Sequence, residues 1–132
     1  VKVTVSAPEE LLMVPMDPIL MEQVLANLLE NAAVHGRAAN VAQVLEAGEG
    51  FARITVRDDG GGIPKGELDS LFDGRLKPHR APDGDGKRNM GLGLSVCRAI
   101  VLAHGGSITA RNLPRGAEFS FRLPTTVKEV PL

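Results

Sequence analysis

The sequence predicts an α/β fold, a two-layer sandwich in which helices cover one face of a mixed, mostly antiparallel sheet. Two long segments repeat their apolar residues at three- and four-residue steps, which is typical of amphipathic helices. Five shorter segments have the character of strands, and four of them form two pairs joined by turns that contain glycine. The order along the chain is therefore strand, helix, hairpin, loop, helix, hairpin, which suits one sheet and one layer of helices.

Clear boundary signals define the first strand and the first helix. Val1–Val5 alternates apolar and polar residues and is ended by Ser6-Ala7-Pro8. Asp17 is placed to cap a helix that has Pro18 as its first residue, and Gly36 ends the helical pattern. The apolar face of this predicted helix consists of Met21, Leu25, Leu28 and Ala32.

The rest of the chain predicts two hairpins around a second helix. The first hairpin turns at Gly48-Glu49-Gly50, and the second passes through Pro114, Arg115 and Gly116. Between them we expect a short helix, a surface lid with few apolar residues, and a helix closed by Gly105-Gly106. The expected ranges are strands at Val41–Ala47, Phe51–Arg57, Ser107–Arg111 and Glu118–Leu123, helices at Glu67–Phe72 and Leu92–His104, the lid at about 73–90 and a frayed tail at about 124–132.

Composition and charge narrow the classes of function. A chain of 132 residues with 43% hydrophobic and 23% charged residues is expected to fold as one domain, residues 1–132. Its formal charge of −1 indicates neither a nucleic-acid partner nor direct contact with an anionic membrane. Cys97 is the single cysteine, so we expect a core residue in a reducing compartment. The chain opens at Val1 within a strand pattern, which favours a segment of a longer protein.

The first candidate site lies on the helix that starts at Asp17. Asn27 and Asn31 are one helical turn apart, and Gln23 and Glu30 extend the same polar stripe. Asparagine disfavours helix interiors, so two of them at this spacing suggest that the stripe faces a ligand. The alternative is an ordinary solvated helix face.

The second candidate site is the segment Asp58–Pro64, at the end of a predicted strand. A carboxylate at a strand end can accept a hydrogen bond from the amino group of a base, and adjacent glycines let a flat ring approach the backbone. This predicts an adenine pocket. The alternative is a surface turn.

The third candidate site is Gly91-Leu92-Gly93-Leu94-Ser95, where the second helix begins. Free backbone N–H groups at a helix start attract anions, and glycine lets phosphate oxygens come close. The alternative is a pair of glycines needed for packing. The spacing fits neither a P-loop nor a Rossmann fingerprint.

The order of these motifs resembles the ATP-binding domain of sensor histidine kinases, in the superfamily that includes gyrase, the heat-shock chaperones and mismatch-repair ATPases. Residues 27–32 resemble the N box, Asp58–Pro64 the first glycine box, Leu71-Phe72 a remnant of the F box, and Gly91–Leu94 the second glycine box. The stretch from Cys97 to Asn112 further resembles the potassium-responsive, Kdp-type sensor kinases.

The resemblance implies a Mg²⁺-ATP site of the Bergerat type. Asn31 would ligate Mg²⁺, Asp58 would bind the adenine amino group, Gly60 and Gly62 would shape the base pocket, and the lid would fold over the phosphates. The residues expected to contact the nucleotide are Asn27, Asn31, Asp58, Gly60, Gly62, Ile63, Lys77, Arg80, Lys87, Met90, Gly91, Leu92, Gly93 and Leu94.

Several positions depart from the family pattern. Asp59 and Gly61 replace its usual Asn and Pro, a change expected to loosen the loop, and Val34 stands where many members carry a basic residue. The family's hydrolases place a catalytic Glu at the position of Asn27, and an amide cannot accept a proton. An ATPase or an anti-sigma-type serine kinase is therefore the weaker alternative, and a degenerate nucleotide-binding regulatory module is another.

In a sensor kinase, the phosphate acceptor is a histidine on a dimerisation domain of the same parent protein. Because no such helix occurs here, we expect the chain to bind ATP without phosphorylating itself. The expected parent is a homodimeric inner-membrane sensor that carries this domain on its cytoplasmic side and acts on a response regulator. The isolated chain is expected to be a monomer.

Overall fold

The computed structural model describes residues 2–8, 14–64, 66–73 and 90–125. Its centre is a five-stranded sheet with the strand order β1-β2-β3-β5-β4. The one parallel pair is β1 with β2, and the pairs β2-β3, β3-β5 and β5-β4 are antiparallel, so the predicted mixed, mostly antiparallel sheet is confirmed. The strands are β1 (Lys2–Ser6), β2 (Asn40–Gly48), β3 (Phe51–Asp58), β4 (Ser107–Asn112) and β5 (Ala117–Pro124).

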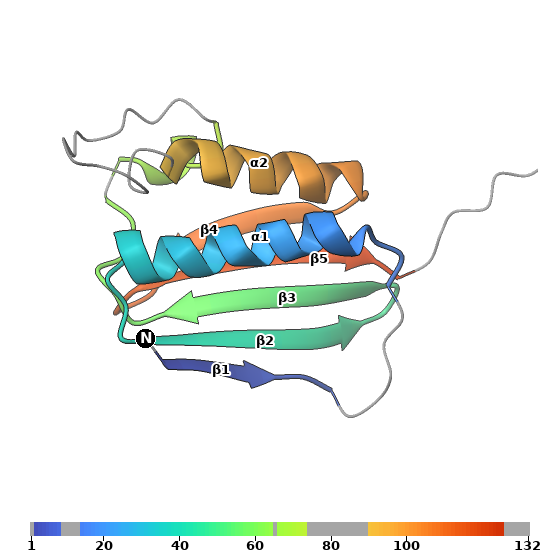
Figure 1. Cartoon of the computed structure of the whole chain (residues 1–132), viewed down its shortest axis with the longest axis horizontal. Coiled ribbons are helices and arrows are strands. Elements are labelled where there is room, and N and C mark those ends of the chain that lie inside the picture. Colours follow the sequence, from blue (N-terminus) through green and yellow to red (C-terminus); the bar gives the residue numbers. More distant parts are fainter. Residues whose placement is uncertain (1, 9–13, 65, 74–89, 126–132) are drawn as a thin grey trace, which may run out of the picture.

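Two long helices cover one face of this sheet (Figure 1). They are α1 (Pro18–Glu30), which continues into a π-helical turn at Asn31–His35, and α2 (Met90–Ala103). The short helix predicted at Glu67–Phe72 is limited to one 3₁₀ turn, Leu68–Ser70. The predicted sandwich with one helical layer is therefore confirmed.

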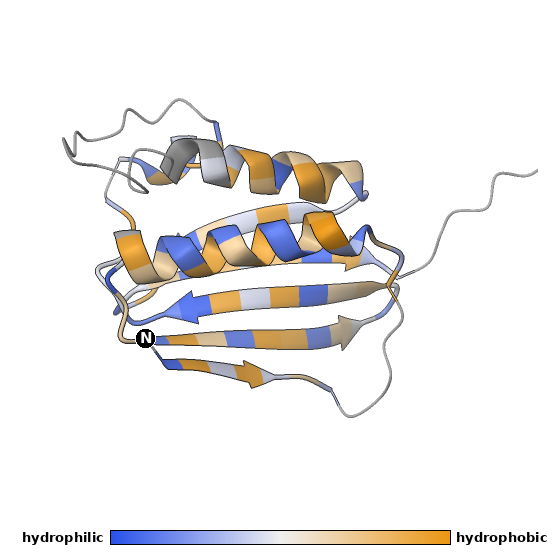
Figure 2. Cartoon of the chain, in the orientation of Figure 1, coloured by the Kyte–Doolittle hydropathy of each residue, from blue (hydrophilic) through white to orange (hydrophobic). Residues whose placement is uncertain are grey.

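The hydrophobic core lies between the helices and the inner face of the sheet. Figure 2 shows the alternation of hydrophobic and hydrophilic residues along the strands that leaves one face apolar. Cys97 is fully buried, its thiol donates to the carbonyl oxygen of Val24 at 3.7 Å, and burial raises its pKa. The predicted core role of this cysteine is confirmed. The main buried side chains are Met21, Val24 and Leu28 of α1, Leu94, Cys97 and Val101 of α2, and Val41, Val56, Phe119, Phe121 and Leu123 of the sheet.

The start of α1 is tied to the end of α2. The Asp17 carboxylate caps α1 by accepting hydrogen bonds from the backbone N–H groups of Ile19 at 3.0 Å and Leu20 at 3.2 Å, as the sequence predicted. The backbone N–H of Asp17 donates to Nε2 of His104 at 3.0 Å, and Nδ1 of the same ring lies 2.8 Å from the carbonyl oxygen of Ile100. This histidine therefore caps α2 and fixes the entry into α1.

Two predicted segments fall largely outside the described residues. Of the lid, only its end residues, Asp73 and Met90, are described. Pro124 ends β5, and the backbone N–H of Thr125 donates to the carbonyl oxygen of Gly50 at 3.0 Å; the remainder of the expected tail is not described. Within the described ranges, no helix has the length and apolar character needed to span a bilayer.

Candidate nucleotide site

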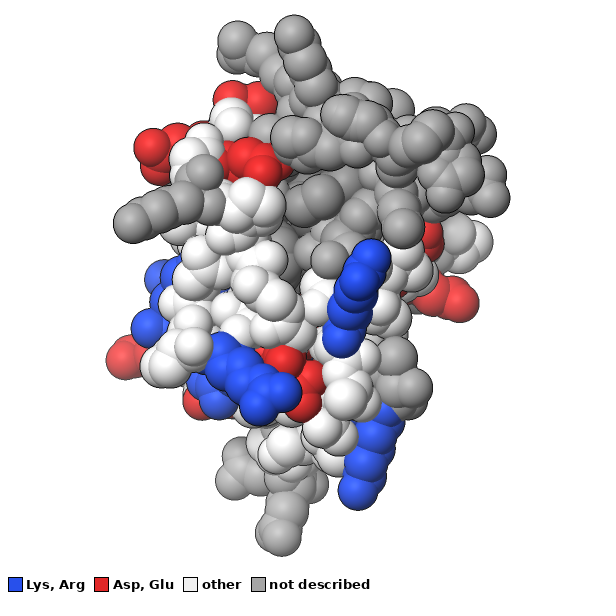
Figure 3. Space-filling view, turned by 90° about the vertical axis from the view of Figure 1, so that its left-hand side faces the viewer, with Lys and Arg blue, Asp and Glu red and all other residues white. Residues whose placement is uncertain are grey.

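The three predicted motifs meet at one end of the molecule. Figure 1 shows that α1 ends, β3 ends and α2 begins at the same side of the sandwich. Figure 3 views that side directly, and among the described residues it shows acidic and basic side chains next to each other between uncharged ones. Residues far apart in the sequence are thus brought to one region.

The first contact between motifs joins the two helices. The side-chain amide of Asn27 donates to the carbonyl oxygen of Gly93 at 3.4 Å. A Cβ at Gly93 would come no closer than 3.9 Å to any described neighbour, the nearest being Cγ of Asn27. Packing within the described chain therefore does not require glycine here, and the absence of a side chain leaves room beside the start of α2.

Asn31 lies where α1 changes its geometry. The backbone N–H of Gly36 donates to the carbonyl oxygen of Asn31 at 3.0 Å, a five-residue step that defines the π-helical turn. Such turns often occur at functional sites. The side chain is 9% exposed, and Oδ1 accepts no hydrogen bond within the described part of the protein. A buried oxygen without a donor costs about 1–3 kcal/mol, so this atom is suited to a ligand that supplies a positive partner.

The donor chemistry at this position fits Mg²⁺. The ion prefers oxygen ligands, and it commonly binds through one or two protein groups together with substrate phosphates and waters. Across the described ranges, no group of three or more His, Cys, Asp or Glu residues could form a cage for a metal. A magnesium ion here would thus be held by the Asn31 amide oxygen and by phosphate, the division that the ion favours.

Asp58 ends β3 and is 7% exposed. Its Oδ1 accepts hydrogen bonds from the backbone N–H groups of Gly60 at 2.9 Å and Ala117 at 3.4 Å. Burial raises the pKa of this carboxyl group, the two backbone bonds oppose the rise, and the nearby Asp59 charge adds to it. Oδ2 makes no hydrogen bond with any described residue, so it can accept one from the amino group of a base.

The glycine loop after Asp58 is fixed by close backbone contacts. The N–H of Gly61 donates to the carbonyl oxygen of Gly36 at 2.8 Å, and a Cβ at Gly60 would lie only 2.0 Å from that oxygen. Gly62 has φ +82°. The backbone N–H of the next residue, Ile63, donates to Oδ1 of Asn112 at 2.7 Å, and the Ile63 carbonyl oxygen accepts from Nδ2 of Asn112 at 3.0 Å. Packing of the loop against the rest of the chain thus explains the glycines, independently of any flat ring that binds beside them.

Gly36 connects the magnesium-type position to the adenine-type position. Its N–H bonds to Asn31, its carbonyl oxygen accepts from the glycine loop, and a Cβ placed on it would lie 3.5 Å from Oδ1 of Asp58. Asn31 and Asp58 therefore belong to one continuous set of contacts.

The expectation that Asp59 loosens the loop is wrong. Its Oδ1 accepts from the backbone N–H groups of Ala39 and Asn40, both at 2.9 Å, and its Oδ2 accepts from the Asn40 side chain at 2.8 Å. The bonds from Asn40 lower the pKa of Asp59 to about 2. The carboxylate fastens the end of β3 to the start of β2, a role that its position in the sequence did not indicate.

The other predicted contact residues have different positions. Leu94 is buried in the core at 1% exposed and Ile63 at 6%, so both support the site from within. Met90, Gly91 and Leu92 form the backbone of the first turn of α2, while Lys77, Arg80 and Lys87 lie outside the described residues.

Two positions escaped sequence reasoning. Asn112 holds the glycine loop through Ile63, and Gly116, at φ +92°, passes so close to Asp58 that a Cβ would lie 1.9 Å from the Asp58 carbonyl oxygen. Both are in the β4-β5 hairpin. The one signal in the sequence is the glycine after Pro114-Arg115, which predicts a turn and not a contact with the site. Of the F-box remnant, Leu71 is fully buried and Phe72 packs edge-on against Phe119 with ring centres 6.2 Å apart.

Comparison with known proteins assigns the class. Residues 16–127 match the family described as histidine kinase-, DNA gyrase B- and HSP90-like ATPases. The match covers most of the chain, so the chain belongs to this family, and the resemblance seen in the motifs is confirmed.

Within the family, the chain is similar to sensor protein KdpD. It is 38% identical over 125 residues to KdpD of Clostridium acetobutylicum and 40% identical over 124 residues to KdpD of Escherichia coli. These matches cover 93% and 92% of this chain, and the chain spans 14% of the length of each KdpD.

Solved structures give the same class. The catalytic domain of the histidine kinase ThkA matches with a TM-score of 0.77 and 29% identity, over 94% of this chain and 78% of that one. ThkA in complex with the response regulator TrrA matches with a TM-score of 0.74 and 27% identity, over 94% and 34% of the two chains. The chain is thus a sensor histidine kinase catalytic domain of the ATP-binding type, and the expected Kdp-type likeness is confirmed.

Proposed function

We propose that this domain binds Mg²⁺-ATP between α1, the Asp58 loop and the start of α2, and delivers the γ-phosphate to a histidine on the dimerisation domain of its parent protein. One observation carries the proposal: the buried Oδ1 of Asn31 and Oδ2 of Asp58 have no hydrogen-bond donor among the described residues, and the backbone of Gly36 links the segments that hold them. A nucleotide with its metal would satisfy both atoms.

The residues divide the work. Asp58 accepts a hydrogen bond from the adenine amino group and thereby selects the base. The first turn of α2 presents backbone N–H groups to the phosphates. Bound magnesium offsets the negative charge of the phosphates. Asn31 orients this end of the nucleotide, so the domain acts mainly by positioning.

Direct hydrolysis is less well supported. The amide of Asn27 occupies the position of the hydrolases' catalytic glutamate and is bonded to Gly93, and an amide cannot take a proton from water. Glu30 is exposed and about 100° from Asn31 around the helix. Phosphoryl transfer to a separate acceptor is therefore the favoured reaction, and the chain by itself is expected not to phosphorylate itself.

The remaining features of the proposal concern the parent protein. We place the domain on the cytoplasmic side of a homodimeric inner-membrane sensor that phosphorylates a response regulator, and treat the isolated chain as a monomer. The TrrA complex of ThkA supports the response-regulator partner. Neither nucleic acid nor a direct membrane contact is part of the proposed function.

A nucleotide-binding regulatory module without kinase activity is the second candidate. The observation that favours it is Val34, which is 37% exposed where a basic residue would meet phosphate. Calorimetric titration with ATP, with and without Mg²⁺, tests nucleotide binding first. Mixing the chain with the dimerisation segment then tests transfer: phosphohistidine supports the kinase, and tight ATP binding without phosphohistidine, beside an intact kinase that works, supports the module.

A further inference from the structure

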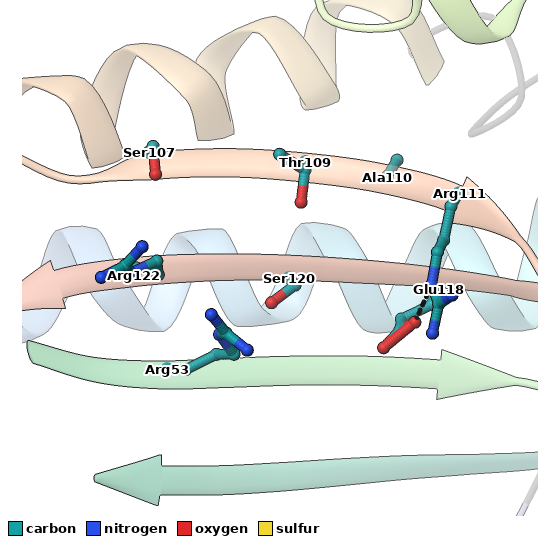
Figure 4. Close-up of a pocket in the computed structure, with 8 residues that line it drawn as sticks. All are labelled: Arg53, Ser107, Thr109, Ala110, Arg111, Glu118, Ser120 and Arg122. Carbon is teal, nitrogen blue, oxygen red and sulfur yellow. Dashed lines mark hydrogen bonds and ion pairs between the residues drawn. The ribbon is translucent and has the colours of Figure 1, made fainter. Parts of the chain in front are cut away.

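The outer face of the sheet, turned away from α1 and α2, carries a hollow of about 580 Å³. Figure 4 views it with the helices behind the strands, and the side chains that line it come from β3, β4 and β5. None of the residues that line it belongs to the candidate nucleotide site.

Strand register arranges this face in rows across β3, β5 and β4. The first row is Arg57, Glu118 and Arg111, the second is Thr55, Ser120 and Thr109, and the third is Arg53, Arg122 and Ser107. Each row has one residue from each strand, all pointing to the outer side.

In the first row, both arginines are paired with a carboxylate. Glu118 is 7% exposed and lies between two guanidinium groups, with Nε of Arg57 at 3.2 Å from Oε1 and Nε of Arg111 bonded to Oε2. Burial acts to raise the pKa of Glu118, but the hydrogen bonds from Arg111 and Arg57 outweigh it and lower the pKa. A carboxylate between two arginines is thus the arrangement that this face itself uses.

The third row has arginines on β3 and β5, and Glu46 of β2 lies opposite Arg53 in the register but forms no ion pair with it within the described chain. Arg53 and Arg122 are directly opposite each other, an arrangement that is unfavourable for like charges. Both guanidinium groups lie over the Phe51 ring, at 5.7 and 3.8 Å from its centre, and neither forms an ion pair within the described chain. Figure 4 shows the two side chains on neighbouring strands, β3 and β5, toward the end of the hollow where Ser107 lies.

Charge separation adds to this asymmetry. The outer faces of β2, β3, β5 and β4 carry four arginines against two glutamates, Glu46 and Glu118, although the whole chain has a formal charge of −1. The hydroxyl groups of Ser120 and Thr109 lie in the row next to the unpaired arginines, and Ser107 lies in their own row. These groups can donate hydrogen bonds to an oxyanion held by the arginines.

We propose that Arg53 and Arg122 form a docking site for an acidic segment of a protein partner, with a carboxylate of that partner completing the third row as Glu118 completes the first. Arginine suits this role because its planar donors match a carboxylate in two places at once. The hollow is open along three strands rather than closed around a small ion, which favours a polypeptide surface. The site is independent of the nucleotide site and of its proposed activity.

The test is a titration of the chain with a fluorescent peptide of alternating glutamate and serine, at low and at high salt. We expect binding that weakens with salt, because exposed charges are screened. In NMR spectra, the Nε–H signals of Arg53 and Arg122 and the amide signals of β4 and β5 should shift. Arg122→Gln should weaken binding by about tenfold, the usual size for the loss of one charge-assisted contact.

Matched controls separate the proposal from a general effect of charge. Arg98 is exposed on α2, so Arg98→Gln makes the same change in net charge away from the outer face. Arg53→Gln is the second test variant, and thermal unfolding of each variant establishes that it folds. Equal weakening by Arg98→Gln, shifts confined to the nucleotide end, or no binding at low salt would overturn the proposal. Inorganic phosphate that binds these arginines as tightly as the peptide would overturn the assignment to a protein partner.

Discussion

Replacing Asn31 by alanine should stabilise the protein without nucleotide and remove its response to magnesium. The substitution removes a buried oxygen that has no described donor, a relief of about 1–3 kcal/mol, and adds the better helix propensity of alanine, about 0.5 kcal/mol. Lost packing of the side chain offsets about 1 kcal/mol of this gain, which leaves a net stabilisation of about 0.5–2.5 kcal/mol. For a domain of this size, that corresponds to an increase in Tm of about 2–10 °C.

A matched substitution on the same helix isolates the buried oxygen. Asn27→Ala gains the same helix propensity but loses the hydrogen bond to Gly93, worth about 1 kcal/mol, so its net effect should be close to zero. The difference in stability between the two variants therefore measures the effect of the buried oxygen of Asn31 and not that of helix propensity. Scanning calorimetry of both variants, with and without nucleotide, measures it.

With nucleotide and magnesium present, the unmodified chain should gain more stability than Asn31→Ala. At 100 times its dissociation constant, Mg²⁺-ATP should stabilise the unmodified chain by about 2.7 kcal/mol. In Asn31→Ala, ATP should give the same small stabilisation with and without magnesium. A variant that melts lower than the unmodified chain, or that keeps the full effect of magnesium, would refute the assignment of this oxygen.

Three further predictions concern the loop after β3. Asp58→Asn should abolish the preference for ATP over GTP, a loss of about 1.5–3 kcal/mol for a hydrogen bond to a charged group. Competition between the two nucleotides measures this preference. An unchanged preference would exclude the carboxylate as the group that selects the base. Folding lowers the pKa of Asp59 to about 2, so its stabilising effect is complete above the unfolded pKa near 3.8 and is lost as the pH falls toward 2. Asp59→Asn should therefore reduce the fall in unfolding free energy at acid pH, which urea unfolding at several pH values measures. An unchanged pH dependence would contradict this prediction. Gly60→Ala should destabilise the fold by more than about 1 kcal/mol, since its Cβ would lie 2.0 Å from the Gly36 carbonyl oxygen. In Gly61→Ala the Cβ would lie 3.9 Å from the same atom, so thermal unfolding of this variant should be nearly unchanged. Equal effects of the two substitutions would show that the loop shifts freely.

Local patterns in the sequence predicted the elements because each depends on near neighbours. Asp17, Pro18 and the apolar repeat are sufficient to start α1, and glycine turns are sufficient to mark both hairpins. The strand order is a different matter. β5 lies between β3 and β4, and β1 pairs in parallel with β2, and both pairings join segments separated by long stretches of chain. No local periodicity encodes such pairings.

The same distinction applies to the site. Asn31 and Asp58 were predicted because their motifs are contiguous. The anchoring by Asp59 was missed because its partners, Asn40 at the start of β2 and Ala39 just before it, are distant in the sequence. The supports from Asn112 and Gly116 come from the last hairpin. The roles of the lid cations stay predictions, because those residues lie outside the described ranges.

The π-helical turn at Asn31–His35 has a consequence for how sequences of this kind can vary in length. A π-helical turn amounts to one residue inserted into an α-helix, and each residue advances a helix by about 100°. Deleting one residue here would restore regular winding and rotate Gly36 out of reach of both Asn31 and Gly61. Insertions and deletions should therefore accumulate at the exposed Gly48–Gly50 turn, while this short segment keeps a constant length.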